Sequence, residues 1–378
     1  MKIRYKTIPY DRNCYASFPG LAQKNGILHL VYRVAGAKSH NAALKGFPTH
    51  HDRDSSVVYL VSKDFGQNWS DPETIFSTSL GVNDPSITAL SDGRLLARFT
   101  EIDVKPSSAR DYLKGPLLAH RPDLGSVSGV AGNYISFSYD DGESWETPQL
   151  MDLENHRYSI TREPVVELSD GTLLLSMYES TPFKTESSFV LRSWDGGGTW
   201  RDASTLATDK AGNNSQFYGI NYNESALLVL PDNRLLAIIR SDESYYTNEG
   251  KDFMTVGGVG EFRSSYSDNL GLSWSPLFLT GVFGQPASLA LLPSGKIFMS
   301  YGRRREPYAI CYRISHDLGR SWEEEHVIRE EISIWDFGYP TTVVTDKAVH
   351  VAYYIPDTEG VRHIELSTIQ FEDIEGFS

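Results

Sequence analysis

Short apolar runs alternate with two-residue polar turns along the whole chain. The apolar segments 87–90 and 95–99, for example, flank Asp92-Gly93. The other turns of this kind are Asn25-Gly26, Asp170-Gly171, Asp232-Asn233, Ser294-Gly295 and Asp346-Lys347. Such turns between β-rich runs are typical of β-hairpins, and no helical 3.6-residue period of useful length is visible. The pattern therefore predicts six hairpins and no substantial helix.

A second motif, Ser-x-Asp-x-Gly-x-x-Trp, is interleaved with the hairpins. Four copies span residues 62–69, 138–145, 193–200 and 315–322, and a fifth copy, 267–274, has Asn in place of Asp. The Asp or Asn side chain can accept hydrogen bonds from the following amides, and Gly takes the position with positive φ. The Trp buries a large apolar area beneath the turn. We interpret this Asp-box motif as structural, so its Asp residues are not candidates for catalysis.

Each unit combines a first hairpin, a connection and a second hairpin closed by the Asp-box, which makes four strands. The units begin near residues 21, 86, 164, 225, 287 and 340. Four-stranded units repeated around an axis are the blades of a β-propeller. The sequence therefore predicts an all-β, six-bladed propeller, with residues 1–378 as one domain. A strand near Ile3–Ile8 would complete the last unit, which lacks an Asp-box, and would hide the edge strands.

Composition narrows the range of functions. The formal charge of −14 argues against a duplex nucleic-acid partner, and no run of eighteen apolar residues suggests a membrane span. Cys14 and Cys311 lack metal-ligand spacing, and no nucleotide-binding or HExxH motif is present, so we expect no metal and no cofactor. The segment Met1–Lys6 lacks the apolar core of a secretory signal. We expect a cytoplasmic protein, or a secreted one if a leader precedes this sequence; the oligomeric state is left open.

Asp-boxes interleaved with hairpins resemble the sialidase (neuraminidase) superfamily over essentially the whole chain. The resemblance implies a retaining exo-glycosidase that releases a terminal acidic sugar from a glycan. Sialidases use a tyrosine nucleophile, because the carboxylate at the anomeric carbon of the sugar would repel a carboxylate nucleophile. The tyrosine needs an adjacent base, the sugar acid needs arginines, and the leaving oxygen needs a general acid.

Segments that match the superfamily imply the positions of the base, the arginines and the nucleophile. The stretch 222–226, followed by Arg240, resembles the segment that carries the base and one arginine, which makes Glu224 the base and Arg240 a carboxylate clamp. Arg303 or Arg304, just before the Asp-box at 315–322, matches a second arginine. Tyr339, which opens the last unit, matches the nucleophile.

The general acid is expected on the loop between the first hairpin and the first Asp-box. This loop contains His50-His51-Asp52-Arg53-Asp54. Asp52 or Asp54 is favoured as the acid, with His50 and His51 as substitutes, and His51 is also a predicted binding contact.

The chain departs from the superfamily at the first arginine. Sialidases open with Arg-Ile-Pro, whereas this chain has Ser17-Phe18-Pro19, so Ser17 stands where that arginine would be. Arg12, Arg33 or Arg53 could replace it in space. The departure leaves the sugar open, and a uronic acid or another ulosonic acid would also fit two cations.

Other polar residues that precede or end inner strands are predicted to line the site. They are Asp84, Arg162 and Arg33. Two alternative functions remain open at this point. The missing first arginine would suit a carbohydrate-binding propeller without catalysis. A related exo-glycosidase would instead use two carboxylates on a non-sialic sugar, with Glu163, Glu224 and Asp84 as candidates and little dependence on Tyr339.

Overall fold

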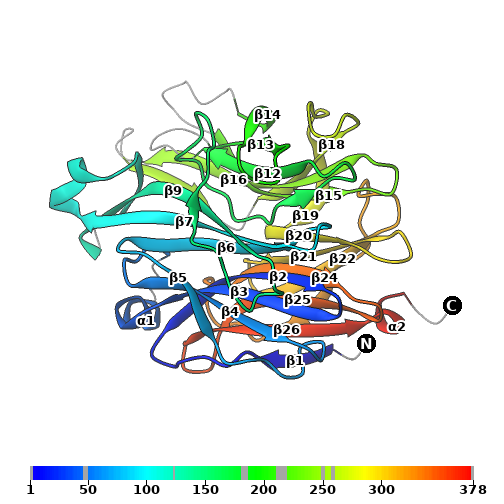
Figure 1. Ribbon diagram of the computed structural model, residues 1–378, viewed down its shortest axis with the longest axis horizontal. Coiled ribbons are helices and arrows are strands. Elements are labelled where there is room, and N and C mark those ends of the chain that lie inside the picture. The colour runs from blue at the N-terminus through cyan, green and yellow to red at the C-terminus, as the bar shows by residue number, and fades with distance from the viewer. Residues whose placement is uncertain are drawn as a thin grey trace.

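The computed structural model describes most of the chain, namely residues 3–45, 50–121, 124–179, 186–209, 219–247, 252–256 and 260–375. Within these residues, six antiparallel sheets follow one another in chain order and form a six-bladed β-propeller (Figure 1). The predicted fold is confirmed, and each predicted two-residue turn joins the first two strands of a blade. No helix in the described part of the chain is long and apolar enough to cross a membrane.

Blades 1 to 3 occupy the first part of the chain. Blade 1 consists of β2 (Tyr15–Lys24), β3 (Ile27–Ala35), β4 (Ser55–Ser62) and β5 (Glu73–Ser77), with helix α1 (Ala37–Leu44) between β3 and β4. Blade 2 consists of β6 (Gly81–Ala89), β7 (Leu95–Pro106), β8 (Leu117–Arg121), β9 (Ser126–Ser138) and β10 (Gln149–Leu150), with the 3₁₀ helix η1 (Ser107–Tyr112) after β7. Blade 3 consists of β11 (Val166–Glu167), β12 (Leu173–Glu179), β13 (Ser187–Ser193) and β14 (Arg201–Ala207).

Blades 4 to 6 follow. Blade 4 consists of β15 (Gly219–Val229), β16 (Leu235–Thr247), β17 (Asp252–Val256), β18 (Glu261–Ser267) and β19 (Phe278–Phe283). Blade 5 consists of β20 (Gln285–Leu291), β21 (Ile297–Arg303), β22 (Ala309–Ser315) and β23 (His326–Arg329). Blade 6 consists of β24 (Gly338–Val344), β25 (Ala348–Pro356), β26 (Arg362–Gln370) and β1 (Ile3–Thr7), and helix α2 (Phe371–Glu375) ends the described chain. The extra strands β8 and β17 and the short helix α1 were not predicted.

The ring closes because the last blade takes its outer strand from the N-terminus. Strand β1 pairs antiparallel with β26, from Ile3 opposite Ile369 to Thr7 opposite Glu365, and the blue and red strands lie side by side in Figure 1. The inner strand β2 contacts both β6 and β24, so the first and last blades meet. One buried apolar cluster includes residues of both blades. Radial closure therefore brings strands far apart in sequence to one axis.

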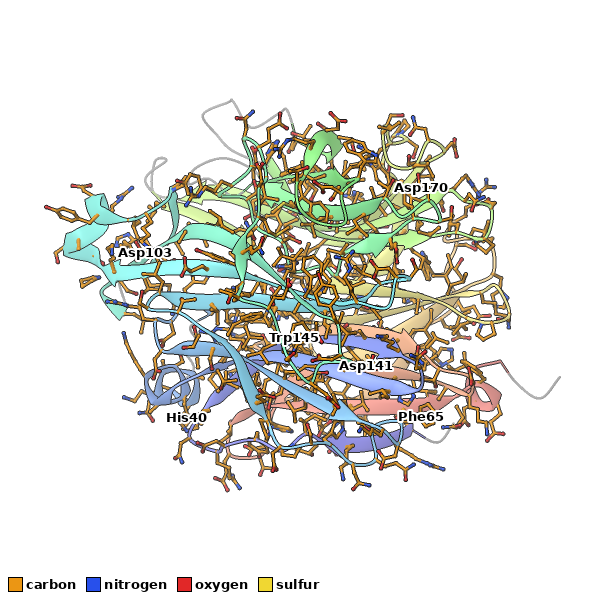
Figure 2. All side chains as sticks on the ribbon, in the orientation of Figure 1. His40, Phe65, Asp103, Asp141, Trp145 and Asp170 are labelled. Carbon is orange, nitrogen blue, oxygen red and sulfur yellow. The ribbon has the colours of Figure 1, made fainter. Side chains whose placement is uncertain are left out.

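The Asp-boxes form the turns that their sequence predicts. In the second copy, Asp140 Oδ1 accepts hydrogen bonds from the Ser144 amide and the Ser138 hydroxyl, each at 2.9 Å, and Gly142 has a φ of 89°. Trp145 of this copy is labelled in Figure 2. The equivalent carboxylate or amide of the other four copies accepts the same pair of hydrogen bonds. These side chains are therefore engaged in local structure.

Five inner strands carry a bulge. The pairing register shifts within β2, β6, β15, β20 and β24. At four of these bulges, Phe18, Asp84, Glu224 and Tyr339 have φ values of 54°, 45°, 35° and 50°. Positive φ is uncommon for residues other than glycine, and such strained residues cluster at functional sites. In each of four blades, the bulge thus changes the direction in which one side chain points.

The burial of the Asp-box tryptophan predicts that it contributes to the stability of the fold. Trp200 has no exposed surface and donates a 3.1 Å hydrogen bond from Nε1 to the Gly197 carbonyl oxygen, whereas its neighbour Trp194 is 58% exposed. We expect Trp200→Ala to lower the free energy of unfolding by about 3–5 kcal/mol through the cavity it creates. The control Trp194→Ala should stay within about 0.5 kcal/mol of wild type. Urea denaturation checks both, and equal losses would contradict the buried structural role of the motif.

Candidate active site

The four bulged residues line one cavity at the axis. Phe18, Asp84, Glu224 and Tyr339 contribute to a cavity of about 220 Å³. The other polar side chains that line it are His50, His51, Asn83, Tyr178 and Glu186. Blades 1, 2, 4 and 6 thus converge on a space surrounded by carboxyl, phenol and imidazole groups.

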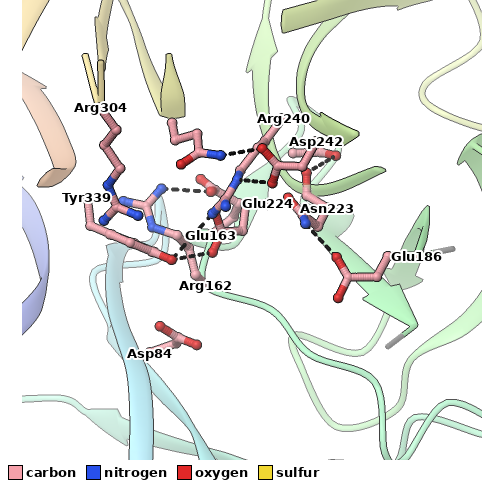
Figure 3. A network of polar contacts seen from close by, with 12 residues as sticks. Asp84, Arg162, Glu163, Glu186, Asn223, Glu224, Arg240, Asp242, Arg304 and Tyr339 are labelled. Carbon is pink, nitrogen blue, oxygen red and sulfur yellow. Dashed lines mark hydrogen bonds and ion pairs between the residues drawn. The ribbon is translucent and has the colours of Figure 1, made fainter. Parts of the chain in front are cut away.

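Tyr339 and Glu224 form the central pair of the site (Figure 3). The Tyr339 hydroxyl donates a 2.7 Å hydrogen bond to Glu224 Oε1, and both residues are less than a tenth exposed. Burial and the neighbouring Glu224 carboxylate raise the pKa of Tyr339, so the phenol is protonated at rest. Although burial opposes it, the charges of Arg240 and Arg162 hold the pKa of Glu224 below its ordinary value. A buried phenol therefore faces an ionised carboxylate that can take its proton.

Arg240 fixes Glu224 from the other side. Its Nη1 pairs with Glu224 Oε2, and its Nε donates a 2.8 Å hydrogen bond to Asp242 Oδ2. The same Nη1 lies 3.5 Å from the Tyr339 hydroxyl oxygen. Gln285 donates to the second oxygen of Asp242, which completes the support (Figure 3). Arg240 thus bridges two carboxylates and holds Glu224 against the tyrosine.

Two more arginines flank the ring of Tyr339. The guanidinium carbons of Arg162 and Arg304 each lie 5.1 Å from the ring centroid. Arg162 pairs with Glu163 at 2.8 Å and donates to the Pro340 carbonyl oxygen at 2.9 Å. Arg304 donates from Nε to the Phe337 carbonyl oxygen at 3.0 Å. Together with Arg240, three arginines from different blades surround the phenol.

Asp84 is the carboxyl group of the cavity whose pKa is raised. Burial, followed by the charge of Glu224, raises the pKa of Asp84 to about 7. Within the described residues its carboxylate has one hydrogen bond, a 3.1 Å contact donated by Asn83 Nδ2. Asp84 and Glu224 therefore have pKa values pushed in opposite directions, the arrangement that assigns an acid and a base in many active sites.

The two aspartates favoured from sequence as the general acid lie outside this cavity. Asp52 accepts hydrogen bonds from the Ser39 hydroxyl and, at 2.9 Å, from the Asp54 amide. Asp54 is exposed. Both serve the loop that contains α1, and neither lines the space beside Tyr339. The neighbouring histidines do line it: His50 contacts Asp336 at 3.0 Å, and His51, whose pKa burial lowers to about 3, contacts Ser128 at 2.7 Å.

The structure separates Arg303 from Arg304. Arg303 donates a 2.7 Å hydrogen bond to the Pro307 carbonyl oxygen and pairs with Glu325, on the outer part of blade 5. Strand β21 ends at Arg303, and the guanidinium of the next residue is the one that lies 5.1 Å from the ring centroid of Tyr339. That residue is Arg304.

Among the residues that the structure describes, no arginine takes the place left by Ser17 inside the cavity. Arg33 lies opposite Ser17 in the β2–β3 register and has no exposed surface. Its Nε donates to the Val82 carbonyl oxygen at 3.0 Å, and its two terminal nitrogens have no hydrogen-bond partner in the described structure. Arg12 pairs with acidic residues of the β25–β26 turn, and Arg53 donates to the Ser79 carbonyl oxygen on the surface. Arg33 thus lies near the site, but its buried side chain does not line the cavity.

Sequence reasoning missed Asp242, Glu186 and Tyr178 as members of the site. Asp242 stands two residues after Arg240 on β16, so the two side chains share a face of the strand, and this spacing could have indicated the pair. Glu186 accepts a 2.5 Å hydrogen bond from Asn223 and immediately precedes β13. No motif in the sequence marks Glu186 or Tyr178.

Comparison with known protein families matches the BNR repeat-like domain over residues 114–351, more than half of the chain. The chain belongs to the BNR repeat-like family. A search of curated proteins finds no match to this BNR repeat-like protein.

Solved structures share its fold. A protein of unknown function from Dyadobacter fermentans has 24% sequence identity and a TM-score of 0.81, with 97% of this chain and 99% of that chain covered. The Hadza microbial sialidase Hz136 has 17% identity and a TM-score of 0.64, covering 95% of this chain and 66% of its own. A Penicillium chrysogenum α-L-arabinanase complexed with arabinobiose has 12% identity and a TM-score of 0.62, covering 95% and 94%. The sialidase-like fold is thus shared with glycoside hydrolases.

The raised pKa of Asp84 predicts a pH-dependent stability difference. Asp84 titrates near 3.8 when unfolded and near 7 when folded, so its ionisation destabilises the folded state increasingly as pH rises through that interval. We expect Asp84→Asn, which stays neutral, to gain free energy of unfolding relative to wild type between pH 4 and pH 8. Denaturant titrations at several pH values measure the gain. Asp268→Asn, at an exposed carboxylate, is the control and should show no such trend, and a flat difference for Asp84→Asn would refute the assignment.

Proposed function

We propose that this BNR repeat-like protein is a retaining exo-glycosidase that uses the tyrosine-nucleophile mechanism of the sialidases, with Tyr339 as the nucleophile and Glu224 as its base. The observation that carries the proposal is the buried 2.7 Å hydrogen bond from the Tyr339 hydroxyl to Glu224. A phenol is a weak nucleophile at neutral pH and becomes effective when an ionised carboxylate can accept its proton. The lowered pKa of Glu224 supplies that carboxylate.

In the proposed first step, the Tyr339 oxygen attacks the anomeric carbon while its proton passes to Glu224. The glycosidic carbon–oxygen bond breaks, and the protonated carboxyl of Asp84 donates its proton to the leaving oxygen. Water then attacks the anomeric carbon, the Asp84 carboxylate takes the proton of that water, and Glu224 returns its proton to the departing phenolate. Two displacements at one carbon retain its configuration.

The surrounding arginines support this chemistry electrostatically. Negative charge develops on the Tyr339 oxygen as its proton leaves, and Arg240 Nη1 lies 3.5 Å from that atom. Arg162 and Arg304 lie over the ring, so they also stabilise a phenolate.

A second mechanism uses two carboxylates. Here Glu224 itself attacks the anomeric carbon, Asp84 is the acid and base, and Tyr339 and Arg240 only orient Glu224. The opposite pKa shifts of Glu224 and Asp84 favour it, because glycosidases with two carboxylates need one ionised and one protonated group. Glu163, the other carboxylate considered from sequence, pairs with Arg162 and does not line the cavity.

The nucleophile can be identified by substitution and trapping. We expect Tyr339→Phe to lower kcat by about two to four orders of magnitude, because the phenol oxygen that attacks is gone. Tyr301→Phe is a matched control, because Tyr301 also donates a 2.7 Å hydrogen bond to a glutamate, Glu325, but lies away from the cavity. Its activity should stay within about twofold of wild type.

The same experiment separates the candidates. A fluorinated glycoside that accumulates the covalent intermediate should label the peptide that contains Tyr339, as read by mass spectrometry. A label on Glu224 would instead establish the mechanism with two carboxylates. Binding of glycans without any turnover by the wild-type protein would leave a carbohydrate-binding propeller.

The adjacent arginines provide a second test. Arg304→Gln removes the cation over the Tyr339 ring and a charged hydrogen bond to Phe337, so we expect kcat to fall by about 10- to 100-fold. Arg303→Gln removes a cation of the same strand end that pairs with Glu325, and kcat should stay close to that of wild type. Steady-state kinetics on one aryl glycoside compares them, and equal effects would argue against a role for Arg304 at the phenol.

A further inference from the structure

The carboxyl groups that line the cavity affect which class of sugar it can bind. Asp84, Glu186 and Glu224 all line it, and among the described residues that line it there is no lysine or arginine. Carboxyl groups form hydrogen bonds with hydroxyl groups, and those that are ionised, as Glu224 is, repel other carboxylates. The wall is therefore suited to a hydroxyl-rich ligand and unsuited to a sugar acid.

The three arginines near Tyr339 are already engaged by the protein. Arg240 bridges Glu224 and Asp242, and Arg162 is paired with Glu163 and bound to a carbonyl oxygen. Arg304 directs Nε and Nη2 to the Phe337 carbonyl oxygen. Recognition of a carboxylate by a fork of arginines needs parallel N–H groups that are free to point at the ligand. These arginines contact Tyr339 or Glu224, and none of them is among the residues that line the cavity.

Three further basic side chains in or near the cavity do not change this balance. Arg33 has two terminal nitrogens without a partner in the described structure, but its side chain has no exposed surface and lines no cavity beside Tyr339. His51 is neutral at physiological pH, because burial lowers its pKa to about 3. His50 contacts the buried carboxylate of Asp336.

An unpaired acceptor in the wall points to a hydroxyl donor. Asn83 lines the cavity, and its Oδ1 is buried without a hydrogen-bond partner in the described structure. Its Nδ2 is occupied, because it donates to Asp84. A buried acceptor needs a donor, which a sugar hydroxyl provides.

We propose that the cavity binds a neutral sugar, recognised through its hydroxyl groups, and that it excludes sialic and uronic acids. This inference rests on the proposed function for the location of the site and adds the class of sugar. It also agrees with Ser17, which stands where sialidases have the first arginine of their carboxylate-binding set and which carries no positive charge.

A panel of neutral and acidic sugars, in which glucose and glucuronic acid differ only at C6, tests the inference on the wild-type protein. Ligand-observed NMR and calorimetry would measure binding of arabinose, galactose, glucose, glucuronic acid and N-acetylneuraminic acid. Turnover would be measured with the corresponding aryl glycosides of both anomers. We expect binding and turnover within the neutral set and at least about tenfold weaker binding of both acids, a factor equal to about 1.4 kcal/mol.

A matched pair of variants connects the preference to the wall. Glu186→Gln should weaken binding of the neutral sugar by about fivefold or more, because one strong acceptor of hydroxyl hydrogen bonds is lost. Glu167→Gln, at a carboxylate that binds Ser91 away from the cavity, should leave it unchanged.

The outcomes distinguish this inference from the proposed function. Turnover of a sialoside or uronoside would overturn the neutral-sugar inference and leave the glycosidase intact. Binding of neutral sugars without turnover of any glycoside would support the inference and remove the proposed enzyme. Preferred binding of an acid, or binding of neither class, would overturn the inference.

Discussion

Closure of the ring is the constraint on which every feature of the site depends. Tyr339 and Glu224 are 115 positions apart in sequence and lie on blades 6 and 4, yet they share a 2.7 Å hydrogen bond. That distance requires the inner strands to be held at fixed angles around the axis. Strand β2 packs against both β6 and β24, and β1 completes the sheet of blade 6. If the ring opened, Tyr339 and Glu224 would move apart even if the sheet of each blade stayed intact.

The arrangement of charge follows from the same closure. Glu224 would be destabilised by burial if it were alone, since an isolated buried carboxylate tends to take up a proton. Arg240 offsets this by direct pairing, and Arg162 adds charge from a third blade. Asp84 has no paired arginine at its carboxylate within the described residues, and its pKa rises. The pKa of one carboxyl is thus lowered and that of the other is raised within one cavity.

The fold and the centre of the site were predictable from sequence because both depend on local patterns. Five Asp-boxes and six turns define the blades without any knowledge of contacts, and Glu224 and Tyr339 belong to segments that match a known superfamily. Arg303 and Arg304 could not be separated, because the choice depends on where β21 ends and on the direction that each side chain takes there. Asp52 and Asp54 were favoured by loop position alone, whereas the role of Asp84 depends on burial, which a sequence does not display.

The bulged positions explain how one fold can change substrate without changing shape. Phe18, Asp84, Glu224 and Tyr339 have similar positive φ values on four blades, so they are equivalent places in the repeat that carry different chemistry. Pro19, Pro85 and Pro340 follow three of them, and proline cannot donate to the strand ladder, so the bulge suits it. The backbone therefore sets where a side chain points, and the residue sets what it does. We propose that the serine and phenylalanine at the first position alter which sugar is bound, while the pair assigned to the proposed chemistry stays in place on blades 4 and 6.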